Sequence, residues 1–166
     1  MINTVEDIKK FKKDKSFKKI FILCGKKSFV NSGAEKIIKN SVDGKEIKYF
    51  YKNSELPIYE ELIEIILEIK NFKPDLILAI GGGAVIDYSK ISNLVDVRPD
   101  LKNLIVNYSY PFKQKITKLA VIPTTAGSGA EVTSNAVIYV DGIKHSFESE
   151  LLIPDYFFLI PEFLIS

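Results

Sequence analysis

The sequence contains very few of the residues that build disulfide frameworks or metal centres. Its 166 residues include one cysteine, one histidine and one methionine. A single cysteine excludes an internal disulfide framework and a zinc site built from cysteines. Cys24 lies inside an apolar segment, where we expect a small, buried side chain. His145 supplies one imidazole without obvious partners, so we predict no metal site on this chain.

The sequence also lacks a large excess of charge of one sign and any long apolar run. Lysine and arginine number 23 against 21 acidic residues, which gives no indication of a nucleic-acid partner. The basic run Lys9–Lys19 favours a solvated helix face, with a phosphate-binding patch as the alternative. No apolar run approaches membrane-spanning length, and the N-terminus lacks an apolar signal-peptide core. We therefore expect a soluble, cytoplasmic chain without a membrane partner.

Short apolar segments alternate with amphipathic ones along most of the chain. Five segments are predicted strands: Lys19–Cys24, Glu46–Tyr51, Leu76–Ile80, Leu119–Ile122 and Tyr156–Ile160. The first and the fourth are typical of buried strands. Four helices are also predicted. One, capped by Thr4, precedes the first strand, and the others lie within residues 25–40, from Pro57 to the stop at Phe72–Pro74, and from Ala84 to near Asp96. The residues from Arg98 to Lys115 predict a loop with one short helix.

The order of these segments predicts the fold class. Asp141 and Gly142 separate two apolar runs, Asn135–Val140 and Lys144–Glu148, and this pattern predicts a β-hairpin. Strands and helices that alternate in this way favour an α/β fold. We expect a Rossmann-like, mostly parallel sheet with helices on both faces, a β-hairpin insertion, and one domain spanning residues 1–166.

The segment Leu76–Lys90 carries the strongest functional signal. It reads as a buried strand, three consecutive glycines and a helix. Glycines let a ligand approach the backbone closely, and the N-terminus of a helix attracts a pyrophosphate. An ordinary tight turn is the alternative. Gly25 and the loop that begins at Pro123 also follow strands, and the carboxyl ends of parallel strands share one edge of the sheet, so we predict a nucleotide site there.

Four segments, taken in order, match the pattern of a known family. They are Phe21–Gly33, Asp75–Lys90, Ile122–Thr133 (IPTTAGSGAEVT) and Lys144–Glu162. The chain resembles the N-terminal, nucleotide-binding half of the iron-containing alcohol dehydrogenases, which share an architecture with dehydroquinate synthase and glycerol dehydrogenases. The third segment is the most specific, because it is similar to the family's PTTAGTGSEVT.

The resemblance implies roles for particular residues, and it implies no catalytic residue. Gly82, Gly83 and Ala84 would contact the pyrophosphate of NAD or NADP. The other implied contacts are Thr124, Thr125 and Ser128 at the adenosine side, Val137 near the nicotinamide, Lys144 at the nicotinamide ribose, and Asp87 on the glycine-turn helix. Alternatively, Thr124 and Thr125 satisfy loop backbone, Lys144 is a solvated hairpin lysine, and Asp87 pairs with Lys90 at the surface.

Cofactor choice is implied by the residue that closes the turn after the first strand. An acidic residue there would accept bonds from the adenosine ribose and repel a 2′-phosphate. This chain has Gly25, followed by Lys26 and Lys27, whose ammonium groups could pair with a phosphate. We expect NADP to be accepted at least as well as NAD. The alternative is that Gly25 only makes a tight turn and that both lysines point to solvent.

The chain also departs from the family pattern. Ala84 and Ala130 stand where the family usually has serine, and Ile160 stands where it has an aspartate. The resemblance further implies that the metal, iron or zinc, is held by one Asp and three His of a helical C-terminal domain. We expect that domain to be absent from residues 1–166, and therefore no alcohol dehydrogenase activity from these residues alone.

Three classes of function remain open at this point. The first is the NAD(P)-binding domain of a metal-dependent alcohol dehydrogenase, in which hydride passes between nicotinamide and an alcohol or aldehyde. The second is a non-catalytic dinucleotide-binding module. The third is an inactive, truncated remnant or an interaction subunit. The expected partners are a nicotinamide dinucleotide and either a separate C-terminal domain chain or a second copy that covers exposed apolar surface.

Overall fold

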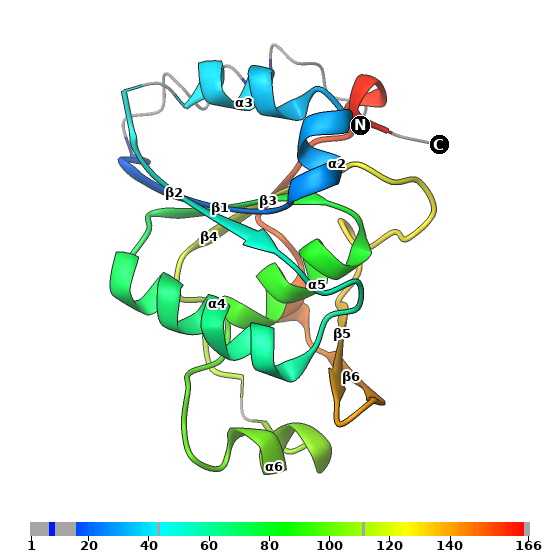
Figure 1. Ribbon diagram of the computed structural model, residues 1–166. Helices are drawn as coiled ribbons and strands as arrows, with labels where there is room; N and C mark the ends of the chain where they lie inside the picture. Colours follow the sequence, from blue (N-terminus) through cyan, green and yellow to red (C-terminus); the bar gives the residue numbers. More distant parts are fainter. Residues whose placement is uncertain (1–6, 9–15, 43, 111, 165–166) are drawn as a thin grey trace.

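A five-stranded parallel sheet forms the centre of the protein in the computed structural model, which describes residues 7–8, 16–42, 44–110 and 112–164 (Figure 1). The strand order is β2-β1-β3-β4-β7. The strands are β1 (Lys19–Gly25), β2 (Glu46–Lys52), β3 (Leu76–Gly81), β4 (Lys118–Pro123) and β7 (Tyr156–Phe157). Because the pairs are parallel, the carboxyl ends of β1, β3 and β4 lie side by side.

The central strands are apolar along their whole length because both faces of the sheet are covered. Every residue of β3 is buried. Along β1, Phe21 and Leu23 belong to one apolar core, whereas Ile20 and Ile22 belong to another. Successive side chains of a strand point to opposite faces, so the two cores lie on opposite sides of the sheet.

Helices cover both faces of the sheet (Figure 1). On one face lie α2 (Lys26–Asn31) and α3 (Ala34–Ser41), and on the other lie α4 (Tyr59–Phe72) and α5 (Gly83–Ser92). The buried side of α4 is an apolar stripe that includes Leu62, Ile65, Ile66 and Ile69. The short helix α6 (Leu101–Val106) lies farther from the sheet than α4 and α5 do.

An antiparallel hairpin lies beside α5 and outside the main sheet (Figure 1). It consists of β5 (Asn135–Val140) and β6 (Ile143–Glu148). Its turn residues Asp141 and Gly142 have φ of +50° and +79°, as a tight two-residue hairpin turn requires. Two short 3-10 helices, η1 (Glu150–Leu152) and η2 (Pro161–Phe163), follow the hairpin. Among the described helices, none has the length and apolarity needed to cross a membrane.

The α/β fold with a hairpin insertion is confirmed, but several boundaries were predicted wrongly. The helix expected within residues 25–40 is two helices, because Gly33 has φ of +73° and breaks the helical path. The helix from Ala84 ends at Ser92 rather than near Asp96. The side chain of Asn93 instead bonds both the carbonyl and the N–H of Thr117, at 2.9 and 3.0 Å.

Other local predictions had mixed outcomes. The last strand is shorter than Tyr156–Ile160, because only Tyr156 and Phe157 pair with β4 before the chain turns into η2. The short helix expected between Arg98 and Lys115 is α6. Cys24 is buried as predicted. The predicted cap at Thr4 and most of the run Lys9–Lys19 lie outside the described residues.

The first glycine of the triplet is required by packing. An added Cβ at Gly81 would lie 2.6 Å from Cγ2 of Val85, whereas a Cβ at Gly83 would meet nothing closer than 3.5 Å. We expect Gly81→Ala to lower the free energy of unfolding by roughly 1–3 kcal/mol, because α5 must move away from β3. The matched control Gly83→Ala should change it by less than about 1 kcal/mol. Urea unfolding of both variants measures the difference, and equal stabilities would contradict the packing argument.

Candidate functional site

Three strands that end in glycine or proline end side by side at one edge of the sheet. β1 ends at Gly25, β3 at Gly81 and β4 at Pro123. Cys24 is in register with Ile80, and Gly81 is in register with Pro123. The three segments that sequence analysis assigned to a nucleotide site therefore begin next to one another.

The glycine turn presents backbone N–H groups at this edge. Gly82 is the N-cap of α5, and its carbonyl accepts bonds from the N–H groups of Val85 and Ile86 at 3.0 and 3.3 Å. The N–H groups of Gly83 and Ala84 precede these in the first helical turn and have no acceptor within the helix. Both residues are half-buried, so a ligand can reach their backbone. The positive end of the helix dipole lies at the same place.

The loop after β4 packs against the glycine turn. Its first residue is tied down by a bond from the Thr124 N–H to the Gly81 carbonyl at 3.0 Å. An added Cβ at Gly82 would lie 3.0 Å from Oγ1 of Thr125, and one at Gly83 would lie 3.5 Å from Cβ of Ser128. The triplet therefore has room for this loop because it lacks side chains.

The three polar side chains of this loop do not share one environment. Thr125 and Ser128 are exposed beside the glycine turn, whereas Thr124 is fully buried. Oγ1 of Thr124 has no hydrogen-bond partner among the described residues. The alternative that this hydroxyl satisfies loop backbone is therefore wrong. The hydroxyl of Ser128 does accept a long bond from the Ala130 N–H, at 3.4 Å.

Asp87 and Lys90 lie on the face of α5 that contacts the hairpin. The carboxylate of Asp87 faces the Val137 N–H, and this interaction favours the charged form of the carboxylate. Lys90 is only 1% exposed, and its Nζ donates to the carbonyls of Thr133 and Asn135 at 2.7 and 2.9 Å. The alternative of a surface pair between Asp87 and Lys90 is wrong, because the Lys90 ammonium is buried and bonds the backbone of the segment that leads into the hairpin.

Burial changes the acid–base properties of both side chains. It raises the pKa of Asp87 to about 6, against the opposing effects of Lys90, the Val137 N–H and Lys144. It lowers the pKa of the Lys90 ammonium to about 8, against the opposing effects of Asp87 and Glu131.

The hairpin has one polar face and one buried face. Val137 and Tyr139 pair with Ser146 and Lys144, so these four residues share a face, on which Lys144 is exposed. Ile138 pairs with His145 on the opposite, buried face. Since the N–H of Val137 interacts with Asp87, the carbonyl is the backbone group that Val137 can offer to a ligand.

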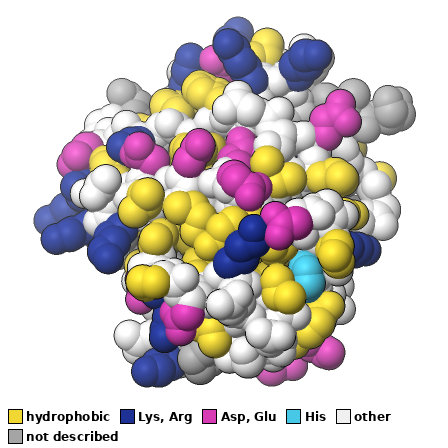
Figure 2. All heavy atoms as spheres, turned by 60° about the horizontal axis from the view of Figure 1, so that its bottom comes forward, with side chains coloured by type: hydrophobic (Ala, Val, Ile, Leu, Met, Phe, Trp, Pro, Cys, Tyr) yellow, Lys and Arg dark blue, Asp and Glu magenta, His cyan; other side chains and the backbone are white. Residues whose placement is uncertain are grey.

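His145 is a packed side chain of the buried face. It is 5% exposed, and its ring lies 5.5 Å from the ring of Tyr108. Figure 2 shows the histidine beside an apolar patch of the surface. No group of three or more His, Cys, Asp or Glu side chains with the arrangement of a metal site occurs among the described residues. The described part of the chain therefore does not fit a family metal site.

Gly25 and Lys26 occupy the β1 side of the same edge. Gly25 has an ordinary extended conformation, with φ of −83° and ψ of 125°, so its position does not demand glycine. An added Cβ would lie 2.8 Å from the Ser28 hydroxyl, which can rotate away. Lys26 and Lys27 are both exposed. A side chain at position 25 would therefore displace the Ser28 hydroxyl, which donates to the Gly25 carbonyl at 3.1 Å.

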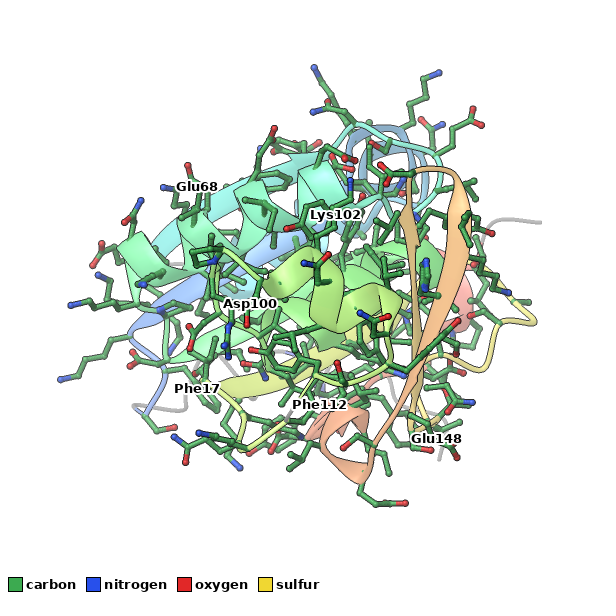
Figure 3. The ribbon with its side chains drawn as sticks, turned by 90° about the horizontal axis from the view of Figure 1, so that it is seen from below. Phe17, Glu68, Asp100, Lys102, Phe112 and Glu148 are labelled. Atoms are coloured by element: carbon green, nitrogen blue, oxygen red, sulfur yellow. The ribbon has the colours of Figure 1, made fainter. Side chains whose placement is uncertain are left out.

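A hollow of about 650 Å³ lies away from this edge, near the amino end of β4. Leu94, Asp96, Arg98, Tyr110, Lys115 and Ile116 line it. Lys115 bonds Asp155 and the Ile153 carbonyl, and Arg98 pairs with Asp100. Figure 3 shows Asp100 and Lys102 at α6, on the same side of the molecule as the hairpin. Arg98 and Lys115 already have acidic partners within the chain, so we do not assign the hollow to the site.

The sequence predicted that these segments lie at one edge of the sheet but did not predict two of their features. The contacts of Lys90 were missed, although the spacing of Asp87 and Lys90 placed both side chains on one side of a helix. The unpartnered hydroxyl of Thr124 was also missed, because no pattern in the sequence distinguishes it from that of Thr125.

The raised pKa of Asp87 predicts a pH dependence of stability. An unfolded aspartate titrates near about 3.9, so between pH 4 and 6 the folded chain binds more protons than the unfolded chain. The contribution of Asp87 to stability therefore falls as the pH rises through this window. We expect the free energy of unfolding of Asp87→Asn, relative to wild type, to increase by about 1–3 kcal/mol between pH 4 and pH 6.5. Urea unfolding at both pH values measures it; a constant difference would contradict the buried environment of Asp87.

Comparisons with known proteins identify the family of the chain. The family model described as iron-containing alcohol dehydrogenase matches residues 2–161. An alcohol dehydrogenase of Thermococcus barophilus is 34% identical over 111 residues, covering 63% of this chain and 29% of that protein. A 4-hydroxybutyrate dehydrogenase of Clostridium kluyveri is 29% identical over 170 residues, covering 99% of this chain and 45% of that protein.

Solved structures show the same fold. An iron-containing alcohol dehydrogenase from Thermococcus thioreducens superposes with a TM-score of 0.82 at 25% identity, covering 98% of this chain and 46% of that one. A sulfoacetaldehyde reductase from Bifidobacterium kashiwanohense, solved in complex with NAD+, has a TM-score of 0.83 at 23% identity and covers 98% and 45%. The chain spans less than half the length of these relatives.

Proposed function

Because the chain belongs to the iron-containing alcohol dehydrogenase family, we propose that it forms the NAD(P)-binding part of an oxidoreductase. The bound nicotinamide would exchange a hydride with an alcohol or aldehyde in the whole protein. The observation that carries the proposal is the free backbone N–H groups of Gly83 and Ala84 at the sheet edge, with the loop from Thr124 packed beside them.

The pyrophosphate is assigned to the N-terminus of α5. Two N–H groups without intrahelical acceptors and the positive end of the helix dipole suit a diphosphate. Ala84 contributes its backbone there, so the missing serine hydroxyl removes one side-chain donor but no backbone donor. Thr125 and Ser128, which are exposed beside the turn, are assigned to the adenosine side.

Thr124 has a different place in the proposal. Its unpartnered hydroxyl is a polar group that a bound ligand could satisfy, but the side chain is fully buried. It bonds a ligand only if the loop shifts on binding. We keep Thr124 as a predicted cofactor residue of the loop, secondary to Thr125 and Ser128.

The nicotinamide side is assigned to the polar face of the hairpin. Lys144 is exposed on this face and supplies an ammonium for the ribose hydroxyls. Asp87 and the Val137 carbonyl lie at the adjacent edge of β5. We keep Asp87 as a predicted cofactor-site residue at this edge, because its carboxylate interacts with the Val137 N–H and with the charge of Lys144.

The metal of the family is not assigned to this chain. The described residues do not provide three convergent ligands, and His145 is packed against Tyr108. We derive no catalytic step through a metal from these residues. A module that binds the dinucleotide without catalysis is the second candidate, which the same lack of a ligand cluster among the described residues favours.

Direct cofactor binding tests the proposal. We expect NADH or NADPH to bind to the chain, with nucleotide fluorescence as the readout, and Gly83→Asp to weaken binding at least tenfold. The added carboxylate would lie beside the pyrophosphate and repel it. The control Gly83→Ala has room for its methyl group and should bind within about threefold of wild type. A folded wild-type chain that binds neither cofactor at millimolar concentration would refute the proposal.

Cofactor choice is tested at the end of β1. We expect NADPH to bind at least as tightly as NADH to the wild-type chain, because Gly25 brings no negative charge and Lys26 is exposed close by. Gly25→Asp should shift the preference toward NADH by roughly tenfold or more through repulsion of the 2′-phosphate. Gly25→Asn has the same shape without the charge and should shift it little. A wild-type preference for NADH at both low and high salt would overturn this assignment.

A further inference from the structure

We propose that Lys90 is a positioning residue of this site: its ammonium fixes the segment Thr133–Asn135 and so sets the place of the hairpin relative to the glycine turn. The proposal rests on the cofactor site described above. It adds a residue that does not itself touch the cofactor.

The Lys90 ammonium is buried and bonded to backbone carbonyls. Lys90 is 1% exposed, and Nζ has three acceptors: the Thr133 carbonyl at 2.7 Å, the Asn135 carbonyl at 2.9 Å and the Thr133 hydroxyl at 3.3 Å. An ammonium has three N–H donors, so the number of acceptors matches. A buried lysine is expensive unless it is bonded in this way.

One edge of β5 is not paired with another strand of the hairpin. One edge of β5 is paired with β6, and alternate residues of a strand direct their backbone groups to the other edge. On that other edge, Lys90 bonds the Asn135 carbonyl at 2.9 Å, and the carboxylate of Asp87 interacts with the Val137 N–H. Farther along, the Tyr139 N–H donates to the Pro57 carbonyl at 2.7 Å. Side chains of α5 thus take the place of a neighbouring strand along the first half of this edge.

The bonds of Lys90 hold a segment that lies between two parts of the proposed site. Thr125 and Ser128 pack on the glycine turn, and Val137 and Lys144 belong to the hairpin. The segment bonded by Lys90 lies between them in the chain. The backbone bond from the Ser149 N–H to the Ser134 carbonyl holds the same segment to the end of β6, but it does not attach that segment to α5.

A single helix therefore carries both halves of the site. The N-terminus of α5 presents the Gly83 and Ala84 N–H groups, and two turns later Lys90 holds the chain that leads into the hairpin. Without the ammonium, two carbonyls lose their donor and the hairpin keeps only the Asp87 and Pro57 contacts at this edge. The distance between the pyrophosphate subsite and Lys144 would then be less well fixed, which weakens binding.

Lys90→Met tests the proposal in the 166-residue chain, because it keeps the length of the side chain and removes the ammonium. The probes are NADH and NADPH, and the readouts are their dissociation constants and amide hydrogen exchange without cofactor. We expect cofactor binding to be at least tenfold weaker than in wild type. We also expect amide exchange to speed up relative to wild type in residues 131–140, and to change less in the main sheet. Lys70→Met, which changes an exposed lysine of α4, is the matched control and should change neither readout.

Rescue distinguishes positioning from a general loss of stability. Lys90→Ala leaves a cavity, and n-propylammonium added to this variant should restore both cofactor affinity and exchange protection, whereas potassium chloride of equal concentration should not. Thr133→Val removes only the 3.3 Å bond and should weaken binding two- to threefold. If Lys90→Met does not fold, the rescue of Lys90→Ala decides the question.

The outcomes separate this inference from the proposed function. A wild-type chain that binds neither cofactor overturns the proposed function and the cofactor part of this inference, while hydrogen exchange still decides whether Lys90 holds the segment. Cofactor binding by Lys90→Met within twofold of wild type, with unchanged exchange in residues 131–140, overturns the inference and leaves the proposed function standing. Failure of propylammonium to restore Lys90→Ala also overturns it.

Discussion

The close approach of α5 to the end of β3 is the constraint on which the rest of the edge depends. Val85 packs where a side chain of Gly81 would be, so the helix begins two residues after the buried strand ends. This short connection directs the first N–H groups of α5 outward at the carboxyl edge of the sheet. It also leaves the Gly81 carbonyl free to accept a hydrogen bond from the Thr124 N–H, so the neighbouring loop begins beside the glycine turn.

The sequence predicts most of this architecture because the signals are local. Buried parallel strands are continuous apolar runs, and the order of strands and helices leaves few arrangements of the sheet. The segments that meet at the edge were predicted for the same reason: Gly25, the glycine triplet and the loop after Pro123 each follow a strand. The sequence also matched the family through four separated segments, and the family is confirmed over residues 2–161.

The features that the sequence did not predict depend on contacts between distant segments. Lys90 bonds residues 43 and 45 positions away, and nothing in the local pattern distinguishes its ammonium from that of an exposed lysine. The end of α5 was predicted too late because Asn93 bonds Thr117, which is 24 positions away. The division of the second predicted helix is different: Gly33 was visible in the sequence, but glycine takes φ of either sign, so the residue alone did not show that the helix stops there.

The attachment of the hairpin has a consequence for how the chain tolerates interruption. β5 is held to α5 and to the Pro57 carbonyl along one edge and to β6 along the other, while the turn at Asp141 and Gly142 is exposed and carries only an exposed ion pair with Lys102. The strands thus do not depend on the turn for their position. Asp141 and Gly142 form a permissive junction, where the backbone can accept an inserted peptide or a reporter domain while both strands keep their neighbours.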